Sequence, residues 1–203
     1  MAQMSALERW LVNSPFRAWL QRGEVRTFLR WAALSPDACV LDMGCGRGVS
    51  TSLIIETLHP QCLAAFDFDP SMVDLARRRL ASRQQEDGID LRVADATKMP
   101  YEDVLFDAVF ESGVVHHVPD WQAAIREVGR VLKPGGRFCF AEPSRKKLRG
   151  FYRILPHAVE STFDADEWRS ALAEAGLEID GTLRRMPLWD ICGVAMKNGD
   201  GKR

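Results

Sequence analysis

The chain has 203 residues, of which 46% are hydrophobic and 27% charged, and its formal net charge is -1. This length suffices for one domain with a sizeable core. The near-neutral charge excludes a general electrostatic attraction to nucleic acid or anionic membranes, so any partner must be recognised locally.

No apolar run approaches the roughly 18 to 20 residues of a membrane span, and the N-terminus carries charges where a signal peptide needs an apolar stretch. We therefore expect a cytoplasmic protein. The five cysteines are odd in number, scattered and set mostly in apolar runs, which favours buried free thiols over disulfides or a zinc site. They are Cys39, Cys45, Cys62, Cys139 and Cys192.

Residues 5–34 predict an N-terminal helical arm, with Asn13 to Pro15 as a cap and restart signal. Its second half places apolar residues on one stripe and three arginines on another. We interpret the basic stripe as a solvated face, and a basic binding surface is the alternative. The apolar stripe is Val25, Phe28, Leu29 and Ala32, and the basic one is Arg22, Arg26 and Arg30.

From residue 38 onward, short apolar strands alternate with amphipathic helices. The predicted strands are "ACVLDMG", "CLAAFDF", "IDLRVAD", "DAVFES" and "RFCFAEP", the last after a turn at "KPGG". The predicted helices are "GVSTSLIIETLH", "PSMVDLARRRLASRQQ" and "DWQAAIREVGRVL". This alternation is typical of an α/β, doubly wound, Rossmann-like fold with a mostly parallel sheet.

The last third predicts a helix at "DADEWRSALAEAG" and two final strands, "LEIDGTLRR" and "PLWDICGVAMK". A short link between those strands requires them to be antiparallel. We therefore expect a seven-stranded sheet in which the last strand is antiparallel.

Each of the first five predicted strands ends in an acid, and ligands of doubly wound sheets lie outside these carboxyl ends. A single acid there is commonly a helix cap or turn former. Five acids along one rim create a negative potential, which favours a cation or a hydroxyl-rich ligand over a pyrophosphate. The five are Asp42, Asp67, Asp95, Glu111 and Glu142.

A glycine run with the spacing G-x-G-x-G follows the first strand, and the third glycine of a dinucleotide fingerprint would fall on Val49. Asp42, just before the run, would repel a phosphate. Asp67 follows Gly48 at about the interval where a carboxylate grips a ribose. These features disfavour NAD and favour a nucleoside that bears a positive centre.

With these motifs, residues 36–143 resemble a class I S-adenosylmethionine-dependent methyltransferase of the small, stand-alone, type 11-like kind. The matching segments are "VLDMGCGRG", "AAFDFDPSMVDLARRR", "VADATKMPYEDVLFDAVF" and "VVHHVPDWQAAIREVGRVLKPGGRF". The resemblance implies one methyltransferase domain over residues 1–203. It comprises an N-terminal helical arm (1–35), a cofactor-binding core (36–143) and a substrate-side segment with the C-terminal antiparallel strands (144–203).

The resemblance also implies contacts for the cofactor, S-adenosylmethionine. Gly44, Cys45 and Gly46 would lie against its methionine portion, and Asp42 would help to hold the amino group through the backbone and water. Asp67 would bind the ribose hydroxyls.

Around the adenine, the resemblance places Phe68 and Met72 on the two sides of the ring. Asp95 would accept from the exocyclic amine, and the backbone near Ala96 would meet the ring. These four residues follow the second and third strands.

Glu111 and Ser112 leave the fourth strand and, by the same resemblance, face the methionine amino group and the reactive methyl. Because the sulfonium already carries an activated methyl, catalysis needs mainly in-line positioning and removal of a proton from the acceptor.

Two histidines, His116 and His117, follow the fourth strand. Adjacent histidines point in different directions and lack a third ligand at a suitable spacing, so we do not expect a metal. One interpretation is packing or capping near the next helix. The other, from a resemblance to small-molecule O-methyltransferases, makes His116 the catalytic base, since an imidazole suits proton removal at neutral pH.

The basic segment from Arg145 to Arg153 interleaves cations with apolar residues. We interpret it as a solvated surface. The alternatives are a lid over an anionic acceptor, an interfacial patch for a lipid-like acceptor, or a weak RNA contact. Where base methyltransferases carry Asn or Asp with Pro-Pro-Tyr, this chain has Glu111-Ser112-Gly113-Val114, so nucleic acid is disfavoured.

We therefore expect a methyltransferase that acts on an O or N atom of a small-molecule acceptor, as a monomer or homodimer. The alternatives are a non-catalytic nucleotide-binding or scaffold module, and a methyltransferase for a lipid-like or macromolecular acceptor.

Overall fold

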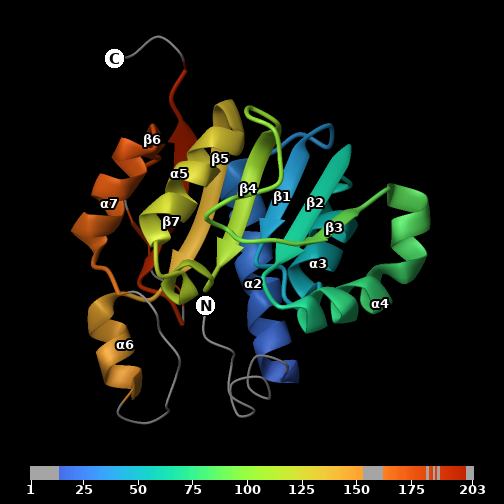
Figure 1. Ribbon diagram of the computed structural model, residues 1–203, viewed down its shortest axis with the longest axis horizontal. Coiled ribbons are helices and arrows are strands. Elements are labelled where there is room, and N and C mark those ends of the chain that lie inside the picture. The colour runs from blue at the N-terminus through green and yellow to red at the C-terminus, as the bar shows by residue number, and fades with distance from the viewer. Residues whose placement is uncertain (1–13, 153–161, 182, 185, 187, 200–203) are drawn as a thin grey trace.

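A computed structural model describes residues 14–152, 162–181, 183–184, 186 and 188–199 (Figure 1). Its centre is a seven-stranded sheet with the order β3-β2-β1-β4-β5-β7-β6. The strands are β1 Cys39–Met43, β2 Cys62–Asp67, β3 Asp90–Val93, β4 Phe106–Ser112, β5 Leu132–Glu142, β6 Leu177–Ile179 and β7 Ile191–Lys197. The helices are α2 Pro15–Ala32, α3 Val49–Leu58, α4 Pro70–Asp87, α5 Trp121–Val131, α6 Arg145–Tyr152 and α7 Ala165–Glu174, with a 3-10 turn, η1, at Val115–His117.

The sheet confirms the predicted fold class. Strands β1 to β5 pair in parallel, whereas β7 is antiparallel to both β5 and β6. The chain runs outward from β1 to β3 and then returns to place β4 on the other side of β1. This reversal is the switch point at which such sheets bind ligands, and it brings Met43 beside Glu111.

Helices cover both faces of the sheet (Figure 1). On one face, Trp168 of α7 and residues of α5 pack against Phe138 and Phe140. On the other face, Phe28 of α2 and residues of α3 and α4 pack against Phe110. Because side chains alternate along a strand, β5 supplies aromatic rings to the first core and small residues to the second.

The predicted start of α2 is confirmed. Ser14 caps the helix by accepting from the backbone N–H of Arg17, and Pro15 occupies the first turn. The apolar stripe is buried apart from the half-buried Leu29, and the three predicted basic residues are exposed, as a solvated face requires. The part of the predicted arm before residue 14 lies outside the described residues.

Two predicted boundaries were wrong. The strand predicted at "RFCFAEP" begins earlier, at Leu132 directly after α5, and Lys133 to Gly136 have no partner on β4 between the pairs Phe106–Leu132 and Ala108–Arg137. The strand predicted at "LEIDGTLRR" is only three residues long, since β6 ends at Ile179 and β7 begins at Ile191.

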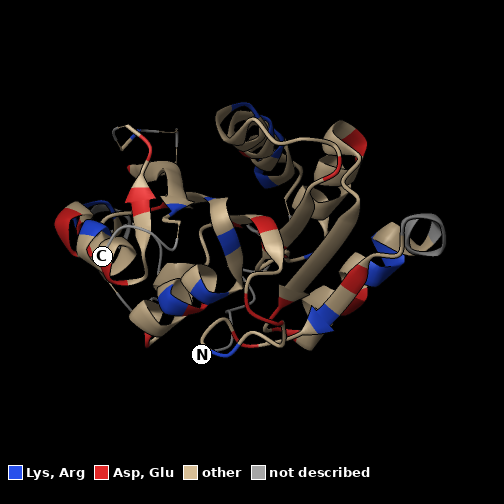
Figure 2. Ribbon diagram, turned by 90° about the horizontal axis from the view of Figure 1, so that it is seen from above, with Lys and Arg blue, Asp and Glu red and all other residues tan. Residues whose placement is uncertain are grey.

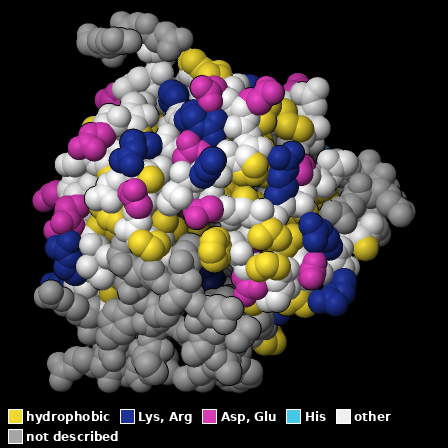
Figure 3. Space-filling model, viewed as in Figure 1, with side chains coloured by type: hydrophobic (Ala, Val, Ile, Leu, Met, Phe, Trp, Pro, Cys, Tyr) yellow, Lys and Arg dark blue, Asp and Glu magenta, His cyan; other side chains and the backbone are white. Residues whose placement is uncertain are grey.

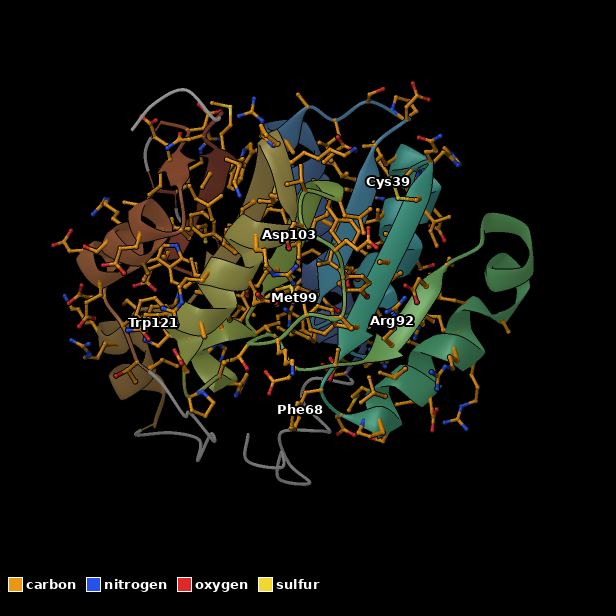
Figure 4. All side chains as sticks on the ribbon, turned by 45° about the horizontal axis from the view of Figure 1, so that its top comes forward. Cys39, Phe68, Arg92, Met99, Asp103 and Trp121 are labelled. Carbon is orange, nitrogen blue, oxygen red and sulfur yellow. A yellow bond between two sulfur atoms is a disulfide. The ribbon has the colours of Figure 1, made fainter. Side chains whose placement is uncertain are left out.

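The cysteine prediction was wrong for one pair. Cys39 and Cys62 face each other in the β1–β2 register and form a disulfide, with their Cα atoms 4.5 Å apart. Cys39 lies at the amino end of β1, away from Phe68 at the carboxyl edge of the sheet (Figure 4). The other three cysteines are buried free thiols, as expected. No helix within the described ranges is long and apolar enough to cross a membrane.

Candidate active site

The glycine loop between β1 and α3 is shaped by three residues with positive φ, at +70° for Gly44, +53° for Gly46 and +77° for Gly48. A Cβ at Gly44 would meet Val114 at 2.3 Å, and one at Gly48 would meet Ala76 at 3.1 Å. At Gly46, by contrast, nothing lies within 4 Å of a Cβ position. The loop therefore leaves open space in front of Gly46, where a ligand could approach the backbone.

Asp42 is buried beneath this loop and accepts hydrogen bonds from two hydroxyls in the first turn of α3. Ser50 Oγ lies 2.7 Å and Thr51 Oγ1 2.6 Å from its Oδ2 atom. Burial raises the pKa of Asp42 from 3.8 to about 6, although these two hydrogen bonds oppose the rise. Asp42 thus ties the end of β1 to the helix that follows the loop.

Asp67, at the end of β2, holds the other side of the loop. Its Oδ2 accepts from the Gly46 N–H at 2.8 Å, and its Oδ1 accepts from the Asp69 N–H at 2.9 Å. Burial raises its pKa. The residue as a whole is half-buried, and the two backbone donors fix its carboxylate in place.

The residues predicted to surround an adenine lie near the same edge but differ in exposure. Phe68 is 42% exposed and extends beyond the end of the sheet (Figure 4). Met72 and Ala96 are buried. Asp95 is exposed and accepts from the backbone and hydroxyl of Thr97, both at 2.8 Å, in a turn after β3.

Glu111 and Glu142, from the neighbouring strands β4 and β5, form a buried carboxyl pair. The Val114 N–H donates to both, at 3.0 Å to Glu111 and 2.9 Å to Glu142, and the Val115 N–H donates to Glu142 at 2.5 Å. Burial raises the pKa of Glu142 to about 7. The pKa of Glu111 is raised well above its ordinary value by burial and then by the Glu142 charge.

His116 lies in η1 directly against this pair. Its Nδ1 atom is 2.6 Å from Glu142 Oε2, and the residue is only 3% exposed. The ring of His117 lies 4.0 Å away and that of Trp189 6.3 Å away, measured between centroids. Sequence reasoning placed Glu142 on the rim but missed its pairing with His116, which is 26 residues away.

The arm helix α2 contributes a residue that the sequence did not single out. Glu24 is 4% exposed, and its carboxylate accepts from Arg17 at 3.1 and 3.0 Å, from Ser112 Oγ at 2.7 Å and from Trp189 Nε1 at 2.8 Å. A glutamate within a helical apolar stripe was the only sequence signal. This cluster joins α2, the end of β4 and the segment before β7.

A small cavity of about 20 Å³ lies where the arm meets the sheet. The sheet and loop line it with Asp42, Met43, Gly44, Ser50, Phe110, Glu111 and Ser112, and α2 lines it with Gln21, Glu24, Val25 and Phe28. Its volume suits about one water molecule. Glu111 Oε2 is buried here with no hydrogen-bond partner among the described residues, so a ligand that donates hydrogen bonds, such as an ammonium group, fits this position.

Other parts of the described surface show fewer features of a functional site. A wider hollow of about 710 Å³ lies between α2 and α3, and none of the site residues above lines it. Within the described residues, no three His, Cys, Asp or Glu side chains gather as a metal site. Charges of both signs are interspersed along the ribbon (Figure 2) and over the described part of the face in Figure 3.

Comparison with known proteins decides the family. The methyltransferase domain family of type 11 matches residues 41–140. A 27-O-demethylrifamycin SV methyltransferase from Amycolatopsis mediterranei is 32% identical over 146 residues, which cover 68% of this chain and 53% of the relative. The chain belongs to the class I S-adenosylmethionine-dependent methyltransferases. A fatty-acid O-methyltransferase from Mycolicibacterium smegmatis is 29% identical over 140 residues, which cover 69% of this chain and 44% of the relative.

Solved structures share the fold of this chain. A chain from a Haloferax volcanii complex with a methyltransferase activator superposes with a TM-score of 0.77 at 18% identity, over 97% of this chain and 98% of that one. A geranyl diphosphate methyltransferase with bound GPP and sinefungin has a TM-score of 0.68 at 18% identity, over 78% and 59% of the two chains. The chain spans about half the length of the curated relatives above.

Proposed function

We propose that this chain transfers the methyl group of S-adenosylmethionine to an oxygen atom of an apolar small molecule. The observation that carries the proposal is the glycine loop at the switch point, fixed by Asp67 through the Gly46 N–H and left open in front of Gly46. Relatives that bear O-methyltransferase names support an oxygen acceptor.

The residues near the loop suit the parts of the cofactor. Asp67 offers a fixed carboxylate to the ribose hydroxyls, and the unpaired Glu111 Oε2 suits the ammonium group of the methionine portion. Phe68 and Met72 would flank the adenine, with Asp95 and the backbone of Ala96 at its edge. When bound, the cofactor supplies an activated methyl group on its sulfonium.

His116 would remove the proton from the acceptor. Since Glu142 engages Nδ1, the exchange of a proton with an acceptor would run through Nε2. Glu142 would keep the ring oriented and stabilise its protonated form, and the Val114 and Val115 N–H groups would keep Glu142 in place. Because His116 is buried, an acceptor must displace groups that lie against it.

The surface beside this site favours an apolar acceptor over an anionic one. Phe16 and Trp19, on the first turns of α2, are 65% and 66% exposed and stack on each other. In the basic segment, Arg145 is paired with Glu167 at 2.6 Å and Asp164 at 3.6 Å, so this cation is already neutralised. The side chains from Arg149 onward lie outside the described residues.

Calorimetry and thermal unfolding with S-adenosylhomocysteine test the cofactor. We expect saturating ligand to raise the melting temperature and NAD to leave it unchanged. Asp67→Ala should abolish the rise, whereas Asp74→Ala, an exposed residue of α4, should preserve it. No stabilisation of the wild-type chain by millimolar S-adenosylhomocysteine would contradict the proposal.

A panel of acceptors tests the reaction, with formation of S-adenosylhomocysteine as the readout. Long-chain alcohols, phenols, fatty acids and amines of matched size should separate oxygen from nitrogen acceptors. Cofactor binding without turnover over the whole panel would favour a non-catalytic module of the same fold.

A further inference from the structure

We infer that Arg17 of the arm helix α2 binds the carboxylate of the cofactor's methionine portion, and that Glu24 holds this cation when no cofactor is bound. The inference rests on the proposed cofactor. Both residues lie outside residues 41–140, which match the family. They would make the arm part of the cofactor site.

The charges around the small cavity require a cation. The methionine portion carries an ammonium and a carboxylate, yet three acids line this cavity: Asp42, Glu111 and Glu24. The acids suit the ammonium, but an unpaired carboxylate placed among them would be strongly disfavoured. Among the described residues that line the cavity or hydrogen-bond to its lining side chains, Arg17 alone is a cation.

Arg17 contacts two of the side chains that line this space, Glu24 and Ser112. Nη1 contacts both carboxylate oxygens of Glu24, and Nη2 lies 3.4 Å from Ser112 Oγ. The guanidinium carbon is 5.5 Å from the centre of the Trp189 ring, and the Arg17 side chain is only 15% exposed. A guanidinium can bind a carboxylate through two parallel N–H···O bonds, whereas Glu24 now contacts Nη1 alone with both of its oxygens.

The volume of the cavity indicates an exchange of partners. A space for about one water cannot hold an amino-acid group, and Glu24 forms part of its wall. The first turn of α2 is tied to the glycine loop, because Arg47 Nη2 donates to the Ser14 carbonyl at 3.1 Å. The incoming carboxylate would therefore replace Glu24 on Arg17 while α2 stays attached to the loop.

The test compares two ligands by calorimetry on the full chain. S-Adenosylhomocysteine carries the amino-acid group, whereas methylthioadenosine has the same nucleoside and sulfur without it. For Arg17→Met we expect about 10- to 100-fold weaker binding of S-adenosylhomocysteine, the range for a lost charged hydrogen bond, and methylthioadenosine affinity within about twofold of wild type. Arg22→Met, an exposed arginine on the same helix, should change neither affinity.

Binding of methylthioadenosine also shows that each variant is folded. Equal weakening of both ligands in Arg17→Met, or no weakening of either, would overturn the inference. Glu24→Gln, which weakens the competing partner, should bind S-adenosylhomocysteine as tightly as wild type or more so. Loss of affinity in this variant as large as in Arg17→Met would overturn the exchange. Failure of the wild-type chain to bind either ligand would instead reject the proposed cofactor.

Discussion

The carboxyl edge of the sheet holds two pairs of acids that are organised differently. Asp42 and Asp67 each have their own donors, which are hydroxyls of α3 for the first and backbone N–H groups for the second. Glu111 and Glu142 share the Val114 N–H, and the charge of Glu142 raises the cost of ionising Glu111. Acids with separate donors are suited to fixing the shape of a loop, whereas a buried pair of acids beside a histidine is suited to holding a proton.

The largest effect should come from substitution of His116, whose ring contacts Glu142 of the second pair. His116→Ala should lower single-turnover rates about 10²- to 10⁴-fold, the range for loss of general base catalysis, with affinity for S-adenosylhomocysteine unchanged. His117→Ala should change the rate less than about threefold. Full turnover in His116→Ala would reduce this histidine to a packing residue and remove the proposed role of the pair.

The first pair should be visible in the pH dependence of stability. The pKa of Asp42 is raised from 3.8 to about 6. Its contribution to the free energy of unfolding is therefore fully present below pH 3.8 and is lost as the pH rises through 6. This corresponds to at most about 3 kcal/mol. Between pH 4 and 7, the unfolding free energy of the wild type should therefore fall relative to that of Asp42→Asn, as denaturant titrations would measure. Parallel pH profiles would show that Asp42 is not protonated more readily in the folded state.

Substitution of Glu142 tests how far catalysis depends on holding the His116 ring in position. Glu142→Gln removes the carboxylate next to Nδ1 and should lower the single-turnover rate about 10- to 100-fold, as loss of an orienting partner does. The pH–rate profile should shift as well, because the ring loses a charge partner. Glu178→Gln, at an exposed position of β6, is the matched control. A wild-type rate and pH–rate profile in Glu142→Gln would show that the Glu111–Glu142 pair has no role in catalysis.

The smallest effect concerns one donor of the first pair. Ser50→Ala leaves Thr51 on Asp42, so we expect a loss of about 1.5 kcal/mol in unfolding free energy. Ser52→Ala, whose hydroxyl contacts Glu56 at the surface, should cost less than about 0.5 kcal/mol. Equal costs for the two variants would mean that the buried hydroxyl does not hold the loop.

The sequence by itself determined the sheet class, the start of α2 at Ser14 and Pro15, and the acids at the strand ends. These features depend on short-range periodicity and on capping chemistry, which neighbouring residues carry. Local signals missed the start of β5, because Leu132, before the "KPGG" segment, pairs with Phe106 of β4.

Only the tertiary structure decided which distant side chains meet. The Cys39–Cys62 disulfide follows from the register of two parallel strands. The contact of His116 with Glu142 and that of Arg17 and Glu24 with Ser112 join segments 26 to 95 residues apart. Such pairings depend on strand order and on how the arm packs against the sheet, which no local pattern of residues specifies.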